Sequence, residues 1–348
     1  MSWHSKIITR RALKRLGILA LLLLILIAIG WRMMLYTPGS SFAGAVTAGP
    51  EDLSSELRRH VIALAEGIGE RGTYKPDAYI KARDYIADQF RAMGYDPRFQ
   101  TFTARDIECS NIEVTVPSTA KANDIFVIGA HYDTVQDSPG ANDNTSGVAG
   151  VLSLARMLKD SHPACTIRLV AFAEEEPPSF QTITMGSMFY AKSCRDRNEN
   201  IVGMFSLETI GYYSDAPDSQ RYPTPFDKVY PSVGNFIAFV ANVQSGGLMR
   251  DSIASFRKHC QFPSEGGAVP DMAPGIGWSD HWSFWQLGYP AVMVTDTAPF
   301  RYSRYHNRGD TPDKLDFGKM AKVIEGLRCV IADLTESPRA PATWSTTP

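Results

Sequence analysis

Hydrophobic positions divide the chain into one long apolar run near its start and many short runs farther along. Leu16 to Trp31 carries no charge, and Met33 to Tyr36 prolong the run past a single Arg32. A helix that spans a membrane needs about 20 predominantly apolar residues, and residues 16–36 have about that length. The pattern therefore predicts a transmembrane anchor at 16–36.

Basic residues cluster on one side of this run, and they predict its orientation. They are Lys6, Arg10, Arg11, Lys14 and Arg15. Positive charge favours the cytoplasmic side, so we expect residues 1–15 in the cytoplasm and the main domain on the far side. This predicts a single-pass inner (cytoplasmic) membrane protein with a periplasmic or extracellular domain. A cleaved signal peptide is the alternative, because Ala43-Gly44-Ala45 resembles a cleavage site.

The remaining chain is predicted to hold one large domain. Residues 37–50 are small and rich in Pro and Gly, as expected of a linker. From residue 51, apolar residues recur at helical spacing, and Pro76 opens a second helical pattern. We expect the domain to cover 51–336 and the last residues, 337–348, to be disordered.

Beyond these helices, short apolar runs alternate with helical patterns. Extended segments are expected at Phe99–Phe102 and Ile112–Val116, and buried strands at Ile125–Ala130, Ile167–Ala173, Val202–Leu207 and Ala291–Val294. Buried strands between helices are typical of a parallel sheet covered on both faces. The predicted fold is an α/β three-layer α/β/α sandwich around a mixed, largely parallel sheet. Ser214–Val233 and Gln261–Trp278 are rich in Pro and Gly and are predicted to be long functional loops.

The composition argues against several classes of function. The formal net charge is −2, so no overall positive field favours nucleic acid as a partner. The five cysteines are scattered without a CxxC pair, which argues against a thiolate zinc site or a redox motif. One disulfide is possible, although buried thiols are expected for most of them.

Chemistry-bearing residues collect where the predicted strands end. His131 and Asp133 follow one strand and Asp143 lies in the loop after it; Glu174-Glu175-Glu176 and Glu208 follow two others, and a further strand leads to His306. Ligands bind outside the carboxyl ends of such strands. Taken singly, each residue has an ordinary interpretation as a polar strand end, a solvated turn or a helix cap. Crowded together they would repel unless a cation neutralised them, which predicts a metal site with zinc-type His and carboxylate ligands.

The chain resembles the co-catalytic zinc exopeptidases of metallopeptidase family twenty-eight, which include aminopeptidases and glutamate carboxypeptidases. The likeness covers about residues 51–335. It rests on several blocks in the same order: GAHYDTV at 129–135, SPGANDNTSGVAGVLSLAR at 138–156, IRLVAFAEEEPP at 167–178, MGSMFYA at 185–191, SLETIGYY at 206–213, SDHWSFWQLGYPAVMVTDT at 279–297 and YHNRGDTPDKLD at 305–316.

The resemblance implies a function and a role for each site residue. Asp143 would bridge two zinc ions, with His131 and Glu208 on one ion and Glu176 and His306 on the other. Asp133 would orient His131, and Glu175 would act as general base in the hydrolysis of a peptide substrate. The expected protein is thus a zinc-dependent exopeptidase. Aminopeptidase activity is the preferred interpretation, ahead of carboxypeptidase activity. Asp280 is expected either to orient the site or to cap the helix that follows it.

Departures from the family pattern leave alternatives open. The usual Glu pair is a triplet here, so base and ligand are either Glu175 and Glu176 or Glu174 and Glu175. Glu208 stands where many members have Asp, which leaves the second metal in question. Glutaminyl cyclase is the rival enzyme, and a non-catalytic receptor or adaptor with the same fold is the rival of another class.

Overall fold

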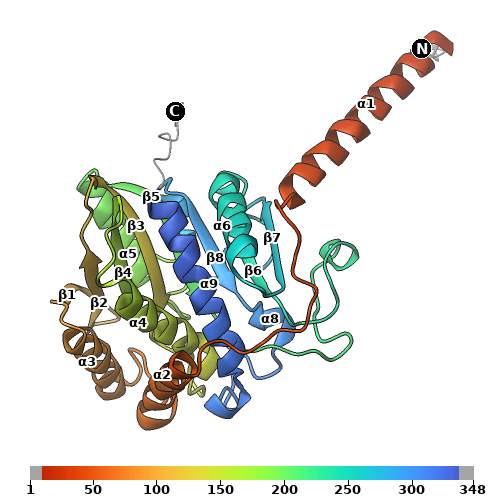
Figure 1. Cartoon of the computed structure of the whole chain (residues 1–348). Coiled ribbons are helices and arrows are strands. Elements are labelled where there is room, and N and C mark those ends of the chain that lie inside the picture. Colours follow the sequence, from red (N-terminus) through yellow and green to blue (C-terminus); the bar gives the residue numbers. More distant parts are fainter. Residues whose placement is uncertain (1–9, 337–348) are drawn as a thin grey trace, which may run out of the picture.

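The computed structural model describes residues 10–336 of the chain. Its centre is an eight-stranded sheet in the order β1-β2-β4-β3-β5-β8-β6-β7 (Figure 1). The strands are β1 Arg98–Ala104, β2 Ile107–Val116, β3 Lys121–His131, β4 Cys165–Phe172, β5 Asn200–Glu208, β6 Ile237–Asn242, β7 Ser264–Val269 and β8 Ala291–Thr295. The expected strands are all present, and only the one at Ile167–Ala173 extends past its observed end, Phe172.

The middle of the sheet is parallel, because β4, β3, β5 and β8 run in the same direction. The antiparallel β1 and β2 extend it on one side, and the β6–β7 pair, antiparallel to β8, extends it on the other. Strand β3 is buried on both faces. Phe126 and Ile128 pack into one hydrophobic core, whereas Ile125 and Val127 pack into a second. This double burial explains why the strand is a continuous apolar run.

Helices cover both faces and complete the predicted three layers. Helices α2, α3, α4, α6 and α9 contact one another on one face, while α5 and α7 pack together on the other (Figure 1). Their bounds are α2 Glu51–Val61, α3 Pro76–Ala92, α4 Gly147–Leu158, α5 Gly186–Asp196, α6 Gly246–His259, α7 His281–Gln286, α8 Ala298–Arg301 and α9 Phe317–Glu336. Short helical turns occupy Ile62–Ile68, Ala141–Ser146, Phe226–Lys228 and Pro312–Lys314. The predicted sandwich is confirmed.

One loop prediction is wrong. The stretch Gln261–Trp278 contains β7, which pairs in parallel with β6 over its whole length. Gly266 and Gly267 lower the intrinsic strand preference of this segment, and only pairing with its neighbour in the sheet makes it a strand. By contrast, Ser214–Val233 is a loop with one short helical turn, as expected.

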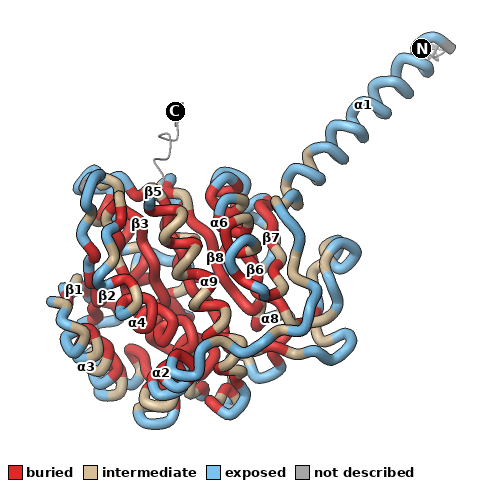
Figure 2. Tube along the Cα trace, in the orientation of Figure 1, coloured by how far each residue is buried: buried red, intermediate tan, exposed pale blue. Residues whose placement is uncertain are grey.

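The apolar run forms helix α1, Arg10–Leu35, which projects from the domain (Figure 1). Its segment Leu13–Leu35 is long and apolar enough to cross a membrane, and its side chains are almost all exposed (Figure 2). A membrane anchor and a signal sequence both have these properties. Residues 1–9 and the expected tail at 337–348 lie outside the described residues.

Residues 37–50, predicted as a linker, lie against the domain. Arg257 on α6 donates a hydrogen bond to the Pro38 carbonyl (2.9 Å), and the Ser264 N–H of β7 donates to the Ser41 hydroxyl (2.9 Å). Farther along, the Gly49 N–H donates to the carbonyl of Gly318 at the start of α9 (2.8 Å). The segment therefore connects α1 to α2 along a defined path.

Four of the five cysteines are buried, namely Cys109, Cys165, Cys194 and Cys260. Burial raises the pKa of the Cys109, Cys194 and Cys260 thiols to about 12. A thiol that stays protonated is a poor nucleophile and metal ligand, and it packs like a small apolar side chain. The expectation of buried thiols is confirmed for these residues.

Candidate metal centre

The predicted site residues come from one edge of the sheet. His131 ends β3 and Glu208 ends β5, while Glu175 and Glu176 follow the end of β4. These three strands are parallel neighbours, so their carboxyl ends lie side by side. Asp143 joins them from the turn before α4, and His306 joins them from the loop after α8.

Asp143 lies between the two imidazoles and directs one oxygen to each. Its Oδ1 is 3.3 Å from His131 Nε2, and its Oδ2 is 2.9 Å from His306 Nε2. Glu208 Oε2 is also 3.3 Å from His131 Nε2, and Glu176 Oε2 is 3.5 Å from His306 Nε2. Three groups of three potential ligand atoms result: His131, Asp143 and Glu208; Asp143, Glu176 and His306; and His131, Glu175 and Glu176. The first two groups share Asp143.

The electrostatics of this cluster fit bound cations. Burial raises the pKa of Glu175 and of Glu176 well above the ordinary value, and neighbouring carboxylates, Glu208 for the first and Asp143 for the second, add to the effect. Glu176 Oε1 is buried without a hydrogen-bond partner, and Asp143 Oδ2 is buried with His306 Nε2 beside it. Buried carboxylates this close repel one another unless positive charge lies between them. Two imidazoles with three or more carboxylates form a donor set that suits zinc.

Asp133 connects both parts of the cluster. Its Oδ1 accepts a hydrogen bond from the Glu175 N–H (3.1 Å), and its Oδ2 accepts one from the Glu176 N–H (3.0 Å). The same Oδ1 lies 3.4 Å from Nδ1 of His131. Asp133 therefore holds the backbone of the glutamate pair and faces the imidazole nitrogen that points away from Asp143.

The first glutamate of the triplet points elsewhere. Glu174 has a left-handed backbone conformation with φ of 52°, which turns its side chain away from the next two. Its Oε1 accepts a hydrogen bond from the Thr73 N–H (3.1 Å), and its Oε2 accepts bonds from the Thr73 and Ser179 hydroxyls. In contrast, Glu175 Oε2 is 4.0 Å from His131 Nε2.

Two residues that sequence reasoning missed hold the loop of Asp143. Asp310 accepts hydrogen bonds from the N–H groups of Asn142 (2.8 Å) and Asp143 (3.0 Å). The buried Arg71 guanidinium donates to the Tyr132 carbonyl (2.6 Å), the Pro139 carbonyl (3.0 Å) and the Thr145 hydroxyl (2.6 Å). Asp310 lies in the same sequence block as His306, so its position was a usable signal. No sequence signal pointed to Arg71, because it donates hydrogen bonds mainly to backbone carbonyls that are distant in the sequence.

Asp280 is fully buried next to the cluster and makes no capping hydrogen bond to α7. The capping interpretation is therefore wrong. Burial raises its pKa to about 7, and attraction to His131 opposes that rise. Arg301 is also buried, and it donates hydrogen bonds to Gln220 and to the Phe236 carbonyl.

A model of peptidase family M28 matches residues 111–331. The chain belongs to this family. Among curated M28-like relatives, the uncharacterized protein YfbL of Escherichia coli is 35% identical over 292 residues, covering 80% of this chain and 87% of YfbL. A probable leucine aminopeptidase 1 of Trichophyton verrucosum is 27% identical over 322 residues, covering 86% of this chain and 79% of its own.

Solved structures show the same fold at lower identity. A zinc aminopeptidase from Bacillus subtilis superposes with a TM-score of 0.65 at 14% identity, covering 82% of this chain and 95% of that one. A glutaminyl cyclase from Fimbriiglobus ruber superposes with a TM-score of 0.60 at 20% identity, covering 85% and 99%. This aminopeptidase and this cyclase thus share the overall fold of the chain.

Proposed function

We propose that this M28 protein is a zinc-dependent aminopeptidase with two zinc ions per chain. The observation that carries the proposal is the position of Asp143, whose two oxygens face different imidazoles. We assign His131 and Glu208 to one ion, Glu176 and His306 to the other, and Asp143 to both. Family membership and a relative that is described as a probable leucine aminopeptidase support the assignment.

In this proposal Glu175 is the general base. Bound zinc supplies a Lewis acid and lowers the pKa of a coordinated water. The Glu175 carboxylate accepts a proton from the attacking water and returns it to the leaving amine. Its backbone is held by Asp133, which keeps the carboxylate beside the cluster. Asp133 also orients His131, and Glu174, engaged with Thr73, takes no part.

A glutaminyl cyclase is the second candidate, because cyclases with this fold are known. Both imidazoles and the carboxylate between them are retained here, which supports the two-metal peptidase over a one-metal cyclase. The same retention argues against a non-catalytic receptor or adaptor.

We also propose a location for the protein. Helix α1 anchors the chain in the inner membrane with its basic N-terminal segment in the cytoplasm, and the peptidase domain is periplasmic or extracellular. The exposed apolar surface of α1 supports the anchor. Two fusions after residue 348 test the orientation. One carries a reporter that is active only in the cytoplasm, and the other carries a reporter that is active only in the periplasm.

The function is tested with the full chain purified in detergent. We expect it to release the N-terminal residue from aminoacyl anilides and short peptides, to contain two zinc ions by elemental analysis, and to lose activity with a chelator. A matched substrate with an acetylated N-terminus is the control, and it should resist cleavage. Loss of ammonia from a peptide with N-terminal glutamine, without cleavage, would instead identify a cyclase.

A further inference from the structure

A cavity of about 120 Å³ opens beside the metal centre, over the part of the sheet formed by β8, β6 and β7. Glu208 borders it on the metal side, together with Tyr305, whose ring stacks on His306 at 3.8 Å between centroids. A substrate side chain that enters this cavity therefore belongs to a residue at the reacting end of the substrate.

The floor of the cavity is a row of residues in register across four strands. Glu208 pairs with Thr295, Thr295 with Ala238, and Ala238 with Glu265. Neighbouring strands are about 4.8 Å apart, so Glu265 lies on the order of 14 Å along the row from Glu208. One carboxylate thus stands at the metal end of the cavity and another at the far end.

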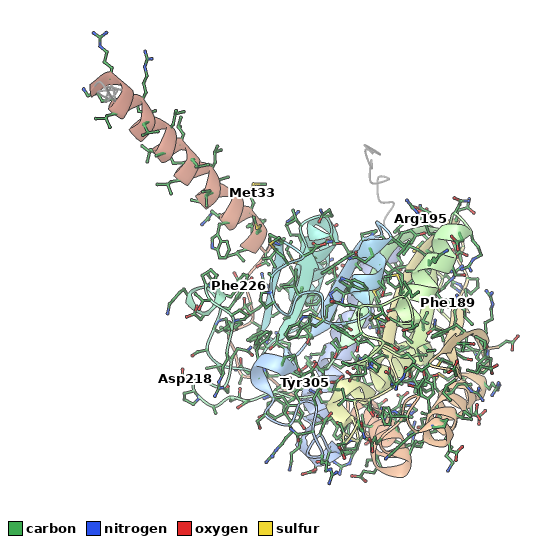
Figure 3. All side chains as sticks on the ribbon, turned by 180° about the vertical axis from the view of Figure 1, so that it is seen from behind. Met33, Phe189, Arg195, Asp218, Phe226 and Tyr305 are labelled. Carbon is green, nitrogen blue, oxygen red and sulfur yellow. The ribbon has the colours of Figure 1, made fainter. Side chains whose placement is uncertain are left out.

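Loops and the short helix α8 form the roof. Helix α5 packs on β2, and α7 packs on β5 and β8, whereas the cavity extends over β6 and β7. The loop Ser214–Val233 contributes Tyr222, Phe226 and Tyr230, and later segments contribute Trp278 and Phe300. Figure 3 shows Phe226 on the side of the domain from which α1 leaves, and it shows Tyr305 farther from α1. The walls are therefore mainly aromatic.

Glu265 faces the cavity and not the helix layer beneath. A Cβ on Gly267, two residues along the same strand face, would lie 2.6 Å from the Tyr230 hydroxyl of the roof. Among residues 10–336, Glu265 and Glu208 are the charged residues that line the cavity, and no Lys or Arg of this range lines it. The nearby Arg257 attracts Glu265 but donates its hydrogen bonds elsewhere, to residues 37–39 and Ser264.

The roof tyrosines do not satisfy Glu265 either. Tyr222 donates its hydroxyl to the Pro231 carbonyl (2.8 Å), and Tyr230 donates to the Gly266 carbonyl (2.9 Å). The Ser41 side chain hydrogen-bonds to Glu265, and burial raises the pKa of the carboxyl. A half-buried carboxylate with one hydroxyl partner retains acceptor capacity for a ligand.

We propose that this cavity receives the side chain of the substrate's N-terminal residue and that Glu265 selects lysine or arginine there. The inference rests on the proposed aminopeptidase function and names its substrate class. The aromatic walls bury the methylene groups of a long side chain and attract its cation. The carboxylate at the far end then accepts charge-assisted hydrogen bonds from that cation.

The test compares lysine and norleucine anilides, which share four side-chain carbons and differ in the terminal ammonium. With the full chain, we expect kcat/KM to favour lysine at least tenfold, since a hydrogen bond to a charged group contributes about 1.5–3 kcal/mol. In Glu265→Gln that ratio should fall about tenfold. Glu265→Asp, which keeps the charge, should retain part of it. The matched control Glu108→Gln, at an exposed glutamate on β2, should behave as wild type.

The outcomes separate the two proposals. Turnover of norleucine at least as fast as lysine by the wild-type chain overturns the role of Glu265 and leaves the peptidase function standing. A lysine preference that survives Glu265→Gln overturns it as well. If no aminoacyl anilide or peptide is cleaved, the proposed function itself fails, and the selectivity fails with it. If Glu265→Gln does not fold, Glu265→Asp decides: its lysine-to-norleucine ratio should fall below that of the wild type, and an unchanged ratio overturns the role of Glu265.

Discussion

The two halves of the sheet carry different parts of the site. At the ends of β3, β4 and β5, together with two nearby loops, six ionisable side chains converge within a few ångströms, and buried hydrogen bonds hold the segments that carry them. Over β6, β7 and β8, by contrast, the surface is apolar and aromatic, with a single carboxylate at its far end. The first half provides reactive groups, and the second provides shape and one point of charge.

The halves also differ in what holds them in place. The metal half is fixed by buried polar residues, because Asp133, Asp310 and Arg71 bond to backbone groups of the segments that carry the ligands. The pocket half is roofed by loops and α8, and Phe226 of that roof stacks on Trp31 of α1 with 5.7 Å between ring centroids. Changes in the first half should therefore alter catalysis for every substrate, and changes in the second should alter discrimination between substrates.

The largest expected effect is that of Glu175→Gln in the metal half. Removal of a general base lowers kcat by roughly 100- to 10,000-fold. We expect the same factor for lysine and norleucine substrates, with zinc content preserved. Glu174→Gln is the matched control, and it should lower thermal stability more than kcat, because Glu174 bonds to Thr73 and Ser179. Equal loss of kcat in both variants would show that the base is assigned to the wrong glutamate.

A smaller effect is expected for Asp133→Asn, which has one acceptor oxygen for two backbone N–H groups. Loss of a residue that orients metal ligands typically weakens metal affinity by about 10- to 100-fold. Competition of the purified chain with a zinc chelator measures this without reference to activity. Asp137→Asn, at an exposed aspartate paired with Arg308, is the control and should bind zinc as wild type does. Unchanged affinity in Asp133→Asn would argue that the metal half does not depend on this tether.

The smallest effect is expected in the pocket half, for Trp31→Ala. An aromatic pair contributes roughly 1 kcal/mol. Its loss should therefore raise KM for lysine and norleucine substrates by about fivefold at most, while kcat stays near wild type. Leu22→Ala, on the exposed part of α1, is the matched control and should leave both parameters unchanged. A large fall in kcat for Trp31→Ala would contradict the separation of the two halves.

Much of the architecture could be predicted because local patterns already agree with it. The buried runs that became β3, β4, β5 and β8 are mostly apolar, with Arg168 and Ser206 as interruptions, since each strand lies between two cores. The ends of those runs carry His131, Glu208 and the glutamate triplet, so parallel order alone brings them to one edge. The anchor-like helix α1 follows from length and composition.

Other features depended on contacts between distant segments. The glycines of β7 weaken its strand pattern, and the strand forms because β6 pairs with it. Glu265 lies in the row of paired residues that begins at Glu208, and only the register of the sheet places it there. Which glutamate of the triplet faces the cluster was decided by Thr73 and Asp133, far away in the sequence. The sequence by itself determined which residue types end the strands, because the mainly apolar runs that form buried strands stop where these polar residues begin. Only the tertiary structure decided which side chains meet, because register and loop packing link positions that no local pattern connects.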